Sequence, residues 1–194
     1  DDFLRLCENQ HPATGETLTQ RLNTTRADGD GSAANRRIFY DFTFSPPKSV
    51  SLAGFLGEDT RVLDAHARAV KSALREFEAF ASTRIRAGGE HSDRRTGNFA
   101  AALFTHDTSR ALDPHLHTHG VVLNATFDPA EQRWKALEVQ GMYRAQKFAE
   151  NLYYHELSRG LRSLGYGIAN NPRDFEIRGV PASVITRFAK RHLQ

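Results

Sequence analysis

The sequence predicts an α+β domain in which an antiparallel sheet packs with helices. Apolar and polar residues alternate from residue 38 to 45, as in a half-buried strand. An apolar stripe at helical spacing begins near residue 59 and continues to about residue 82. A second helical pattern spans about 139 to 164. With 194 residues and no internal repeat, we expect a single domain, 1–194, with its own buried core.

The composition indicates a soluble globular protein of a reducing compartment. Hydrophobic residues make up 39% and charged residues 25% of the chain. We find no apolar run near the roughly 20 residues that cross a bilayer and no signal peptide, so we expect a cytosolic protein without membrane insertion. A single cysteine, Cys7, excludes an internal disulfide and leaves nitrogen and oxygen as metal ligands. The formal net charge of +3 permits a nucleic-acid partner without requiring one.

The first clear strand carries an acid on its more polar face. One face would hold Ile38, Tyr40, Phe42 and Phe44, and the other Phe39, Asp41, Thr43 and Ser45. Two prolines at 46–47 end the strand. The apolar run at 50–55 is either another strand or the start of a helix, and the polar segment 23–37 is predicted to be a loop.

The helix that begins at Asp59 or Thr60 is predicted to cover the core with its apolar stripe. His66 on this helix is expected to be an ordinary surface or boundary histidine. The basic segment 87–97 is predicted to be a loop, where Arg94 and Arg95 either contact phosphates or are simply solvated.

Three strands are predicted to form a meander around a group of histidines. They span 98–106, 116–127 and about 134–137. After the helix at 139–164, short strands at 166–168 and 175–178 precede a final basic helix that opens at Pro181.

Four of the nine histidines lie within fourteen residues, from His106 to His119. His117 and His119 would share one face of a strand, and a neighbouring antiparallel strand could bring His106 beside them. The simpler alternative is a set of solvated histidines. Three imidazoles at this spacing, followed by an apolar strand, favour a metal site.

Three imidazoles around one divalent cation leave a position open for water or substrate, as in catalytic sites. Nitrogen ligands bind zinc, manganese, nickel or cobalt more tightly than magnesium. The bound ion also depends on which ions the cell supplies, so Mg, Mn, Zn and Ni are all candidates. Asp41 is the candidate to hydrogen-bond a ligating histidine, an ordinary salt bridge being the alternative. Ser45, Lys48 and Arg110 lie in loops beside the same strands, where they could hold phosphates.

Two segments resemble the internal motifs of conjugative relaxases of the TrwC/TraI type, which are histidine-hydrophobe-histidine nucleases. The first runs from Phe39 to Ser51, and the second from Leu103 through Arg110 to His117-Thr118-His119 and Asn124. The resemblance implies a palm-like antiparallel sheet related to replication initiators and RNA-recognition folds. It also implies a metal held by His106, His117 and His119 with Asp41 bonded to one of them, and His115 as an extra histidine.

The same resemblance implies an enzyme that nicks one DNA strand at a plasmid transfer origin and rejoins it through a 5′-phosphotyrosine. Its partners would be single-stranded DNA, a DNA hairpin and other relaxosome proteins in the bacterial cytoplasm. Ser45, Lys48, Arg94, Arg95 and Arg110 are the candidate DNA contacts.

The chain departs from the family's pattern in its tyrosines. The family's nucleophile lies near its N-terminus, yet residues 1–39 contain no tyrosine. Tyr153 and Tyr154 lie in the late helix, where packing is the simpler interpretation. We therefore expect a relaxase domain that lacks the tyrosine segment and the helicase half. The alternatives are a DNA-binding module that does not cut, and a hydrolase that uses metal-bound water with Asp107 or Asp113.

Overall fold

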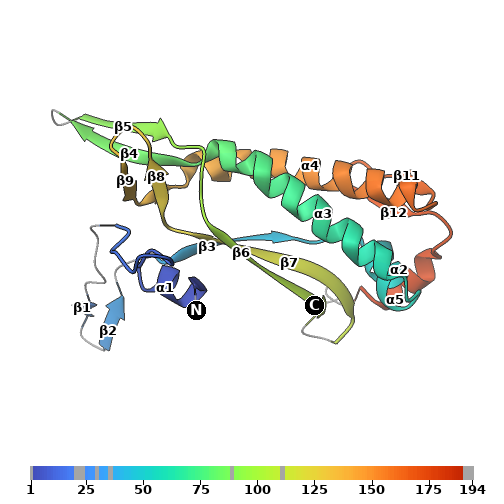
Figure 1. Ribbon diagram of the computed structural model, residues 1–194. Coiled ribbons are helices and arrows are strands. Elements are labelled where there is room, and N and C mark those ends of the chain that lie inside the picture. Colours follow the sequence, from blue (N-terminus) through green and yellow to red (C-terminus); the bar gives the residue numbers. More distant parts are fainter. Residues whose placement is uncertain are drawn as a thin grey trace. The chain divides into compact units, whose positions relative to one another are not determined.

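A computed structural model describes residues 2–19, 25–28, 31–34, 37–87, 90–109 and 112–189 (Figure 1). These residues fall into two compact units. One comprises Asp1–Phe42, Phe77–Ala102 and Gly120–Gln146, and the other comprises Thr43–Glu76, Leu103–His119 and Lys147–Gln194. Because each unit is built from three separate stretches, the units are not two domains in succession along the chain. Both contain helices and strands, which confirms the predicted α+β class.

One three-stranded sheet carries the residues of interest. Its order is β3 (Phe39–Phe44), β7 (Pro114–Leu123) and β6 (Ala101–Thr108), with β7 in the middle. On β3, Phe42 and Phe44 are buried whereas Asp41 and Thr43 are exposed. The alternation predicted for residues 38–45 is therefore confirmed.

The predicted strand at about 134–137 exists, but the prediction that it joins the same sheet as β6 and β7 is wrong. Residues 126–138 instead form β8 (Thr126–Asp128), β9 (Arg133–Lys135) and β10 (Leu137–Glu138), of which β8 and β9 pair with each other. The buried Asp128 carboxylate accepts hydrogen bonds from two turn amides, those of Ala130 and Glu131. This local turn closes β8 on β9, and β3 takes the place beside β7.

Two segments that were predicted to be loops form hairpins. The basic segment 87–97 contains β5 (Glu90–Arg95), which pairs antiparallel with the preceding strand β4 (Ser82–Ala87), and β10 joins on the other side of β4. The N-terminal segment contains β1 (Thr25–Asp28) paired with β2 (Gly31–Ala34). β4 and β5 carry polar residues at successive positions, so they lack the apolar alternation that predicts a half-buried strand.

In the unit that contains Thr43–Glu76, two helices follow the end of β3. The run at 50–55 belongs to α2 (Lys48–Phe55), so the helical alternative was correct, and Pro47 stands at its N-cap. The next helix, α3 (Thr60–Phe77), ends five residues earlier than predicted and is followed by the 3-10 turn η1 (Glu78–Phe80).

The later elements are α4 (Gln140–Ser163), β11 (Ile168–Asn170), β12 (Phe175–Ile177) and α5 (Ala182–Arg187), and a short helix, α1 (Asp2–Cys7), stands near the start of the chain. The predicted helix at 139–164 and the strand at 175–178 are confirmed, the strand predicted at 166–168 lies two residues later, and α1 was not predicted. In the described ranges, every helix is too short or too polar to span a bilayer.

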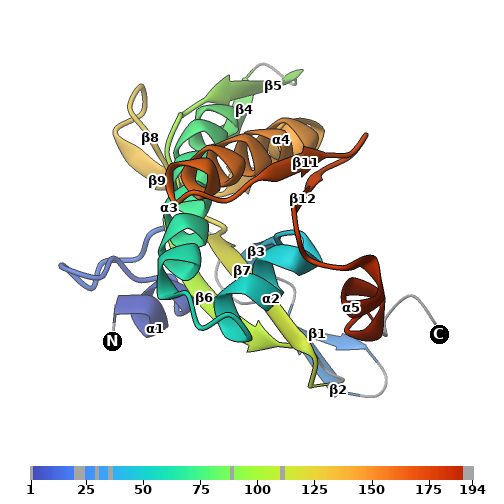
Figure 2. The ribbon, with the colours of Figure 1, turned by 90° about the vertical axis from the view of Figure 1, so that its right-hand side faces the viewer.

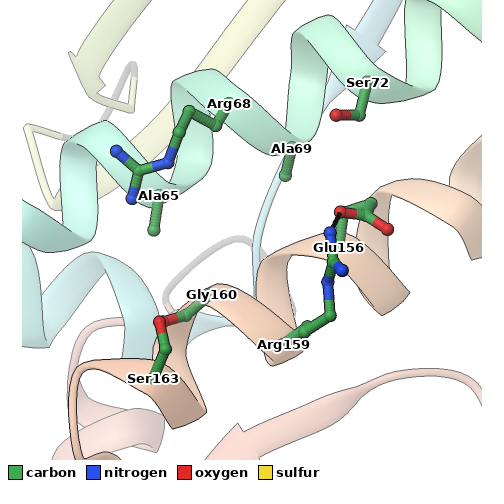
Figure 3. A pocket seen from close by; sticks show the side chains of 8 residues that line it. All are labelled: Ala65, Arg68, Ala69, Ser72, Glu156, Arg159, Gly160 and Ser163. Atoms are coloured by element: carbon green, nitrogen blue, oxygen red, sulfur yellow. Dashed lines mark hydrogen bonds and ion pairs between the residues drawn. The ribbon is translucent and has the colours of Figure 1, made fainter.

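Helices α3 and α4 run side by side in both ribbon views (Figures 1 and 2). A groove of about 370 Å³ separates them (Figure 3). It is lined by Ala65, Arg68, Ala69, Ser72, Glu156, Arg159, Gly160 and Ser163. A Cβ atom added to Gly160 would lie 3.4 Å from the Ala65 Cβ, so the small residues let the helices approach closely. This approach brings His66 of α3 within hydrogen-bonding distance of Tyr153 of α4.

Candidate metal centre

The central strand β7 presents its histidines on one face. His115, His117 and His119 are half-buried, whereas Leu116 and Thr118 between them are 1% and 2% exposed. Because successive strand residues point to opposite faces, the three imidazoles lie on the accessible side and the two intervening side chains lie in the core.

The imidazole of His106 on β6 adjoins those of His117 and His119. Ring centroids are 5.2 Å apart for His106 and His117, 5.5 Å for His106 and His119, and 5.2 Å for His117 and His119. Three imidazoles bound at ~2.1 Å to one tetrahedral ion would have their centroids roughly 5 Å apart. The structure therefore brings together the three predicted ligands at a spacing that suits one metal ion.

The orientation of the rings differs from that of a loaded site. In the described part of the chain, no three His, Cys, Asp or Glu side chains already converge in a way that could hold a metal ion. The His106 and His117 rings are stacked, with an interplanar angle of 26°. Metal binding would thus require at least one of these two rings to turn about its side-chain torsions.

Hydrogen bonds constrain two of the three rings. The Nδ1–H group of His117 donates to the main-chain oxygen of His115 at 3.0 Å, so the lone pair of the neutral ring lies on Nε2. Nδ1 of His119 lies 3.2 Å from Thr43 Oγ1. A ring held through one nitrogen is oriented for metal binding through the other.

Thr43 was not predicted as a site residue. The available signal was its place two residues after Asp41 on the exposed face of β3. Asp41 is itself exposed and belongs to the other compact unit, so its predicted bond to a ligating histidine stays a prediction. Arg110 lies outside the described residues.

Two candidate phosphate contacts lie near the start of α2. Lys48 Nζ donates to the main-chain oxygen of Pro114 at 2.9 Å, which ties the helix to the first residue of β7. Burial lowers the pKa of the Lys48 ammonium, and the Asp113 carboxylate opposes this shift. Ser45 is half-buried, and its main-chain oxygen accepts a long hydrogen bond, 3.4 Å, from the Tyr154 hydroxyl.

Comparison with known proteins identifies the family. The family model described as TrwC relaxase matches residues 1–194. The chain belongs to the TrwC relaxase family. It is 39% identical over 197 residues to the multifunctional conjugation protein TraI of Escherichia coli K12. The aligned region covers 96% of this chain but 11% of the relative.

Solved structures of TrwC share the relaxase fold. A metal-bound complex of the conjugative relaxase TrwC with oriT DNA has a TM-score of 0.84 and 33% identity, covering 98% of this chain and 63% of that one. A complex of TrwC with a 27-mer that comprises the recognition hairpin and the cleavage site has a TM-score of 0.83 and 32% identity, covering 98% and 65%. This chain thus spans less than two thirds of each.

In this TrwC-family chain, the two arginines of β5 have different surroundings. Arg94 Nη1 lies 2.8 Å from the fully buried carboxylate of Asp128 and 3.6 Å from that of Glu131. Burial tends to raise the pKa of Asp128, but hydrogen bonds from Arg94 and two backbone amides leave it lower than usual. Arg95 instead lies over the Phe80 ring, 5.4 Å from its centroid. Arg94 is therefore largely engaged in the fold.

The paired tyrosines of α4 are poor nucleophile candidates in this relaxase-family fold. Tyr153 is 1% exposed, and its ring packs 5.5 Å from that of Phe44. Burial raises the pKa of the Tyr153 hydroxyl well above its usual value and that of Tyr154 to about 12. Both hydroxyls remain protonated at neutral pH, which agrees with the predicted packing role.

Proposed function

We propose that this chain is the metal-binding and DNA-binding core of a relaxase that nicks one strand at a plasmid transfer origin. The cluster of His106, His117 and His119 on two neighbouring strands is the observation that carries this proposal. Family membership and the oriT complexes of TrwC support the choice of substrate.

The three histidines would hold one divalent ion, Mg, Mn, Zn or Ni, with Nε2 of His117 as one ligand atom. Such an ion, when bound, polarises a phosphoryl oxygen and stabilises charge in the transition state. The protein's contribution is orientation. The His115 main-chain oxygen fixes the tautomer of His117, and the Thr43 hydroxyl restrains His119. We propose that Asp41 adds a further bond to the cluster.

The single strand would lie on the accessible face of β6 and β7. Phe104 is 43% exposed and shares a strand face with His106, two residues later, so its ring is suited to stack on a base. Lys48, Ser45 and Arg110 would contact the phosphates. One TrwC structure holds a recognition hairpin, and we propose that Arg95, with a smaller part for Arg94, contacts a similar hairpin here.

The reaction would begin with a tyrosine oxygen that attacks the scissile phosphorus. The bond to the 3′ oxygen breaks, that oxygen leaves with a proton as a 3′-hydroxyl, and a 5′-phosphotyrosine remains. Tyr153 and Tyr154 are engaged in packing, and we propose that the nucleophile is the N-terminal tyrosine that the family resemblance implies, supplied by a longer form of the chain. The complete relaxase would act in the bacterial cytoplasm together with other relaxosome proteins.

The test uses a labelled oligonucleotide with a transfer-origin hairpin and nick site, in the presence of Mn²⁺. The chain is compared with a version extended upstream by a tyrosine-containing segment. We expect both to bind the DNA and only the extended version to give a covalent band on a denaturing gel. Equal cleavage without a covalent band would contradict the tyrosine mechanism and favour a metal-bound water. Binding without cleavage by either version would favour a DNA-binding module.

A further inference from the structure

His66 is a fully buried titratable side chain that the proposed reaction does not use. The sequence suggested a surface or boundary position, but its side chain is 0% exposed. Nδ1 lies 2.8 Å from the Tyr153 hydroxyl and Nε2 lies 2.7 Å from the Thr118 hydroxyl. The prediction of a surface or boundary histidine was therefore wrong. Both ring nitrogens have hydrogen-bond partners, which offset the loss of their hydrogen bonds to water on burial.

The chain of hydrogen bonds continues onto the histidine strands. Thr118 Oγ1 lies 2.9 Å from Thr105 Oγ1, which links β7 to β6. Thr118 stands between His117 and His119 in the sequence, and Thr105 immediately precedes His106. The network thus fastens each strand at a residue adjacent to a proposed metal ligand.

The direction of the hydrogen bonds follows from the donors. The Tyr153 hydroxyl keeps its proton because burial raises its pKa, and within the described ranges its one hydrogen-bond partner is Nδ1 of His66. If the phenol donates to Nδ1, then Nε2–H of the neutral imidazole donates to the Thr118 hydroxyl. The Thr118 hydroxyl in turn donates its hydrogen bond to Thr105 Oγ1. Burial also lowers the pKa of His66 to about 4, so the ring is neutral at pH 7. In this direction the Tyr153 hydroxyl, the His66 Nε2–H group and the Thr118 hydroxyl each have an acceptor.

The register between β6 and β7 is what brings His106 to the other two histidines. A slip of one residue would move His106 to the opposite face of the sheet. A hydrogen-bonded threonine pair across two strands favours a single register. Since His66 and Tyr153 belong to α3 and α4, the network anchors that register to two packed helices.

We propose that His66 is a positioning residue for the metal centre, which acts by holding Thr118 and thereby the spacing of His106, His117 and His119. This inference rests on the proposed function of the three histidines as metal ligands. His66 would touch neither the metal nor the DNA. Its removal should weaken metal binding even in a protein that remains folded.

The decisive experiment measures the dissociation constant for Mn²⁺ from the electron paramagnetic resonance signal of the free ion. We expect His66→Leu and Thr118→Val to bind Mn²⁺ about tenfold more weakly than the wild type, within the range for residues that act through a neighbour. Tyr153→Phe, which keeps the ring, should weaken binding by less. His66→Gln, which retains a donor near the position of Nε2, should restore affinity to within about threefold of the wild type.

The matched control is Val70→Ala, also on α3. Val70 is 1% exposed and apolar, so this variant loses core packing without touching the network. Its Mn²⁺ affinity should equal that of the wild type at a temperature where both are folded. If Val70→Ala weakens binding as much as His66→Leu, general destabilisation explains the effect and the inference is wrong.

Two further outcomes separate this inference from the proposed function. A wild-type protein that fails to bind Mn²⁺ would overturn the metal centre and the inference together. Wild-type binding that is matched by folded His66→Leu would overturn the inference alone. Folding of each variant is verified by its near-ultraviolet circular dichroism before the titration.

Discussion

The Nδ1 atom of His117 lies 3.0 Å from the main-chain oxygen of His115, two residues earlier on the same strand. This contact uses the backbone of His115, whereas the imidazole of His115 stacks on that of His117 with centroids 4.8 Å apart. The two histidines therefore have different roles in the structure, although they alternate on the same face of β7. One orients a proposed ligand and the other is that ligand.

Replacement of His117 by Ala should abolish stoichiometric Mn²⁺ binding, because only two imidazoles of the proposed set would remain. The matched control is His115→Ala, which keeps the main-chain oxygen that holds His117. We expect this control to bind Mn²⁺ within about threefold of the wild type, since a packing contact is lost but no ligand. Isothermal titration calorimetry measures both. One Mn²⁺ per chain in His117→Ala would refute the ligand assignment.

Lys48 offers a test of the proposed phosphate contacts. Lys48→Met keeps the aliphatic stem but removes the charge and the bond to Pro114. We expect weaker binding of single-stranded DNA and a salt dependence of the affinity that is reduced by about one counterion. Lys71→Met, at an exposed position of α3, is the matched control and should change neither quantity. Fluorescence anisotropy at several salt concentrations distinguishes the two, and equal effects would mean that Lys48 contributes only net charge.

Local sequence periodicity was enough to predict much of the fold. The alternation at Phe42 and Phe44, the stripe of α3 and the pattern of α4 each depend on neighbours within a few residues, so the sequence predicts them well. The pairing of β7 with β3 could not be predicted in this way. Pairing with β3 joins segments about 75 residues apart, and nothing local distinguishes β3 from the nearer strand at 133–135.

The histidine cluster was predictable because the spacing of His117 and His119 fixes a shared face. The burial of His66 was not predicted, although a signal existed. It lies four residues after Val62 and four before Val70, both of which are buried, so it continues their stripe. Histidine is found both inside and outside proteins, and only its long-range partners, Tyr153 and Thr118, decide between the two.

The depressed pKa of His66 makes stability depend on pH in a defined direction. Burial lowers the pKa to about 4 in the folded protein, against about 6.5 in the unfolded chain. The contribution of the neutral ring is therefore complete above pH 6.5. It is lost as the pH falls toward 4, because the unfolded state binds the proton first. The loss attributable to His66 amounts to about 3 kcal/mol at most.

Urea unfolding at a series of pH values checks this prediction. The wild type should lose stability between pH 6.5 and about 4 more steeply than His66→Gln, which has no group that titrates there. Absolute stabilities will differ because the substitution alters the core, so the slopes are compared. Parallel profiles for the two proteins would contradict the buried neutral state of His66.

Arg94 and Arg95 are neighbours on β5, yet their replacement should have different consequences. Arg94→Ala leaves the buried carboxylate of Asp128 without its 2.8 Å partner, and we expect a loss of about 2 kcal/mol in the free energy of unfolding. Arg95→Ala removes a contact over the Phe80 ring and should cost less than about 1 kcal/mol, while it weakens binding of hairpin DNA. Chemical denaturation and anisotropy with a hairpin oligonucleotide separate the two effects. Equal destabilisation by both substitutions would show that the ion pair of Arg94 contributes no more than the ring contact of Arg95.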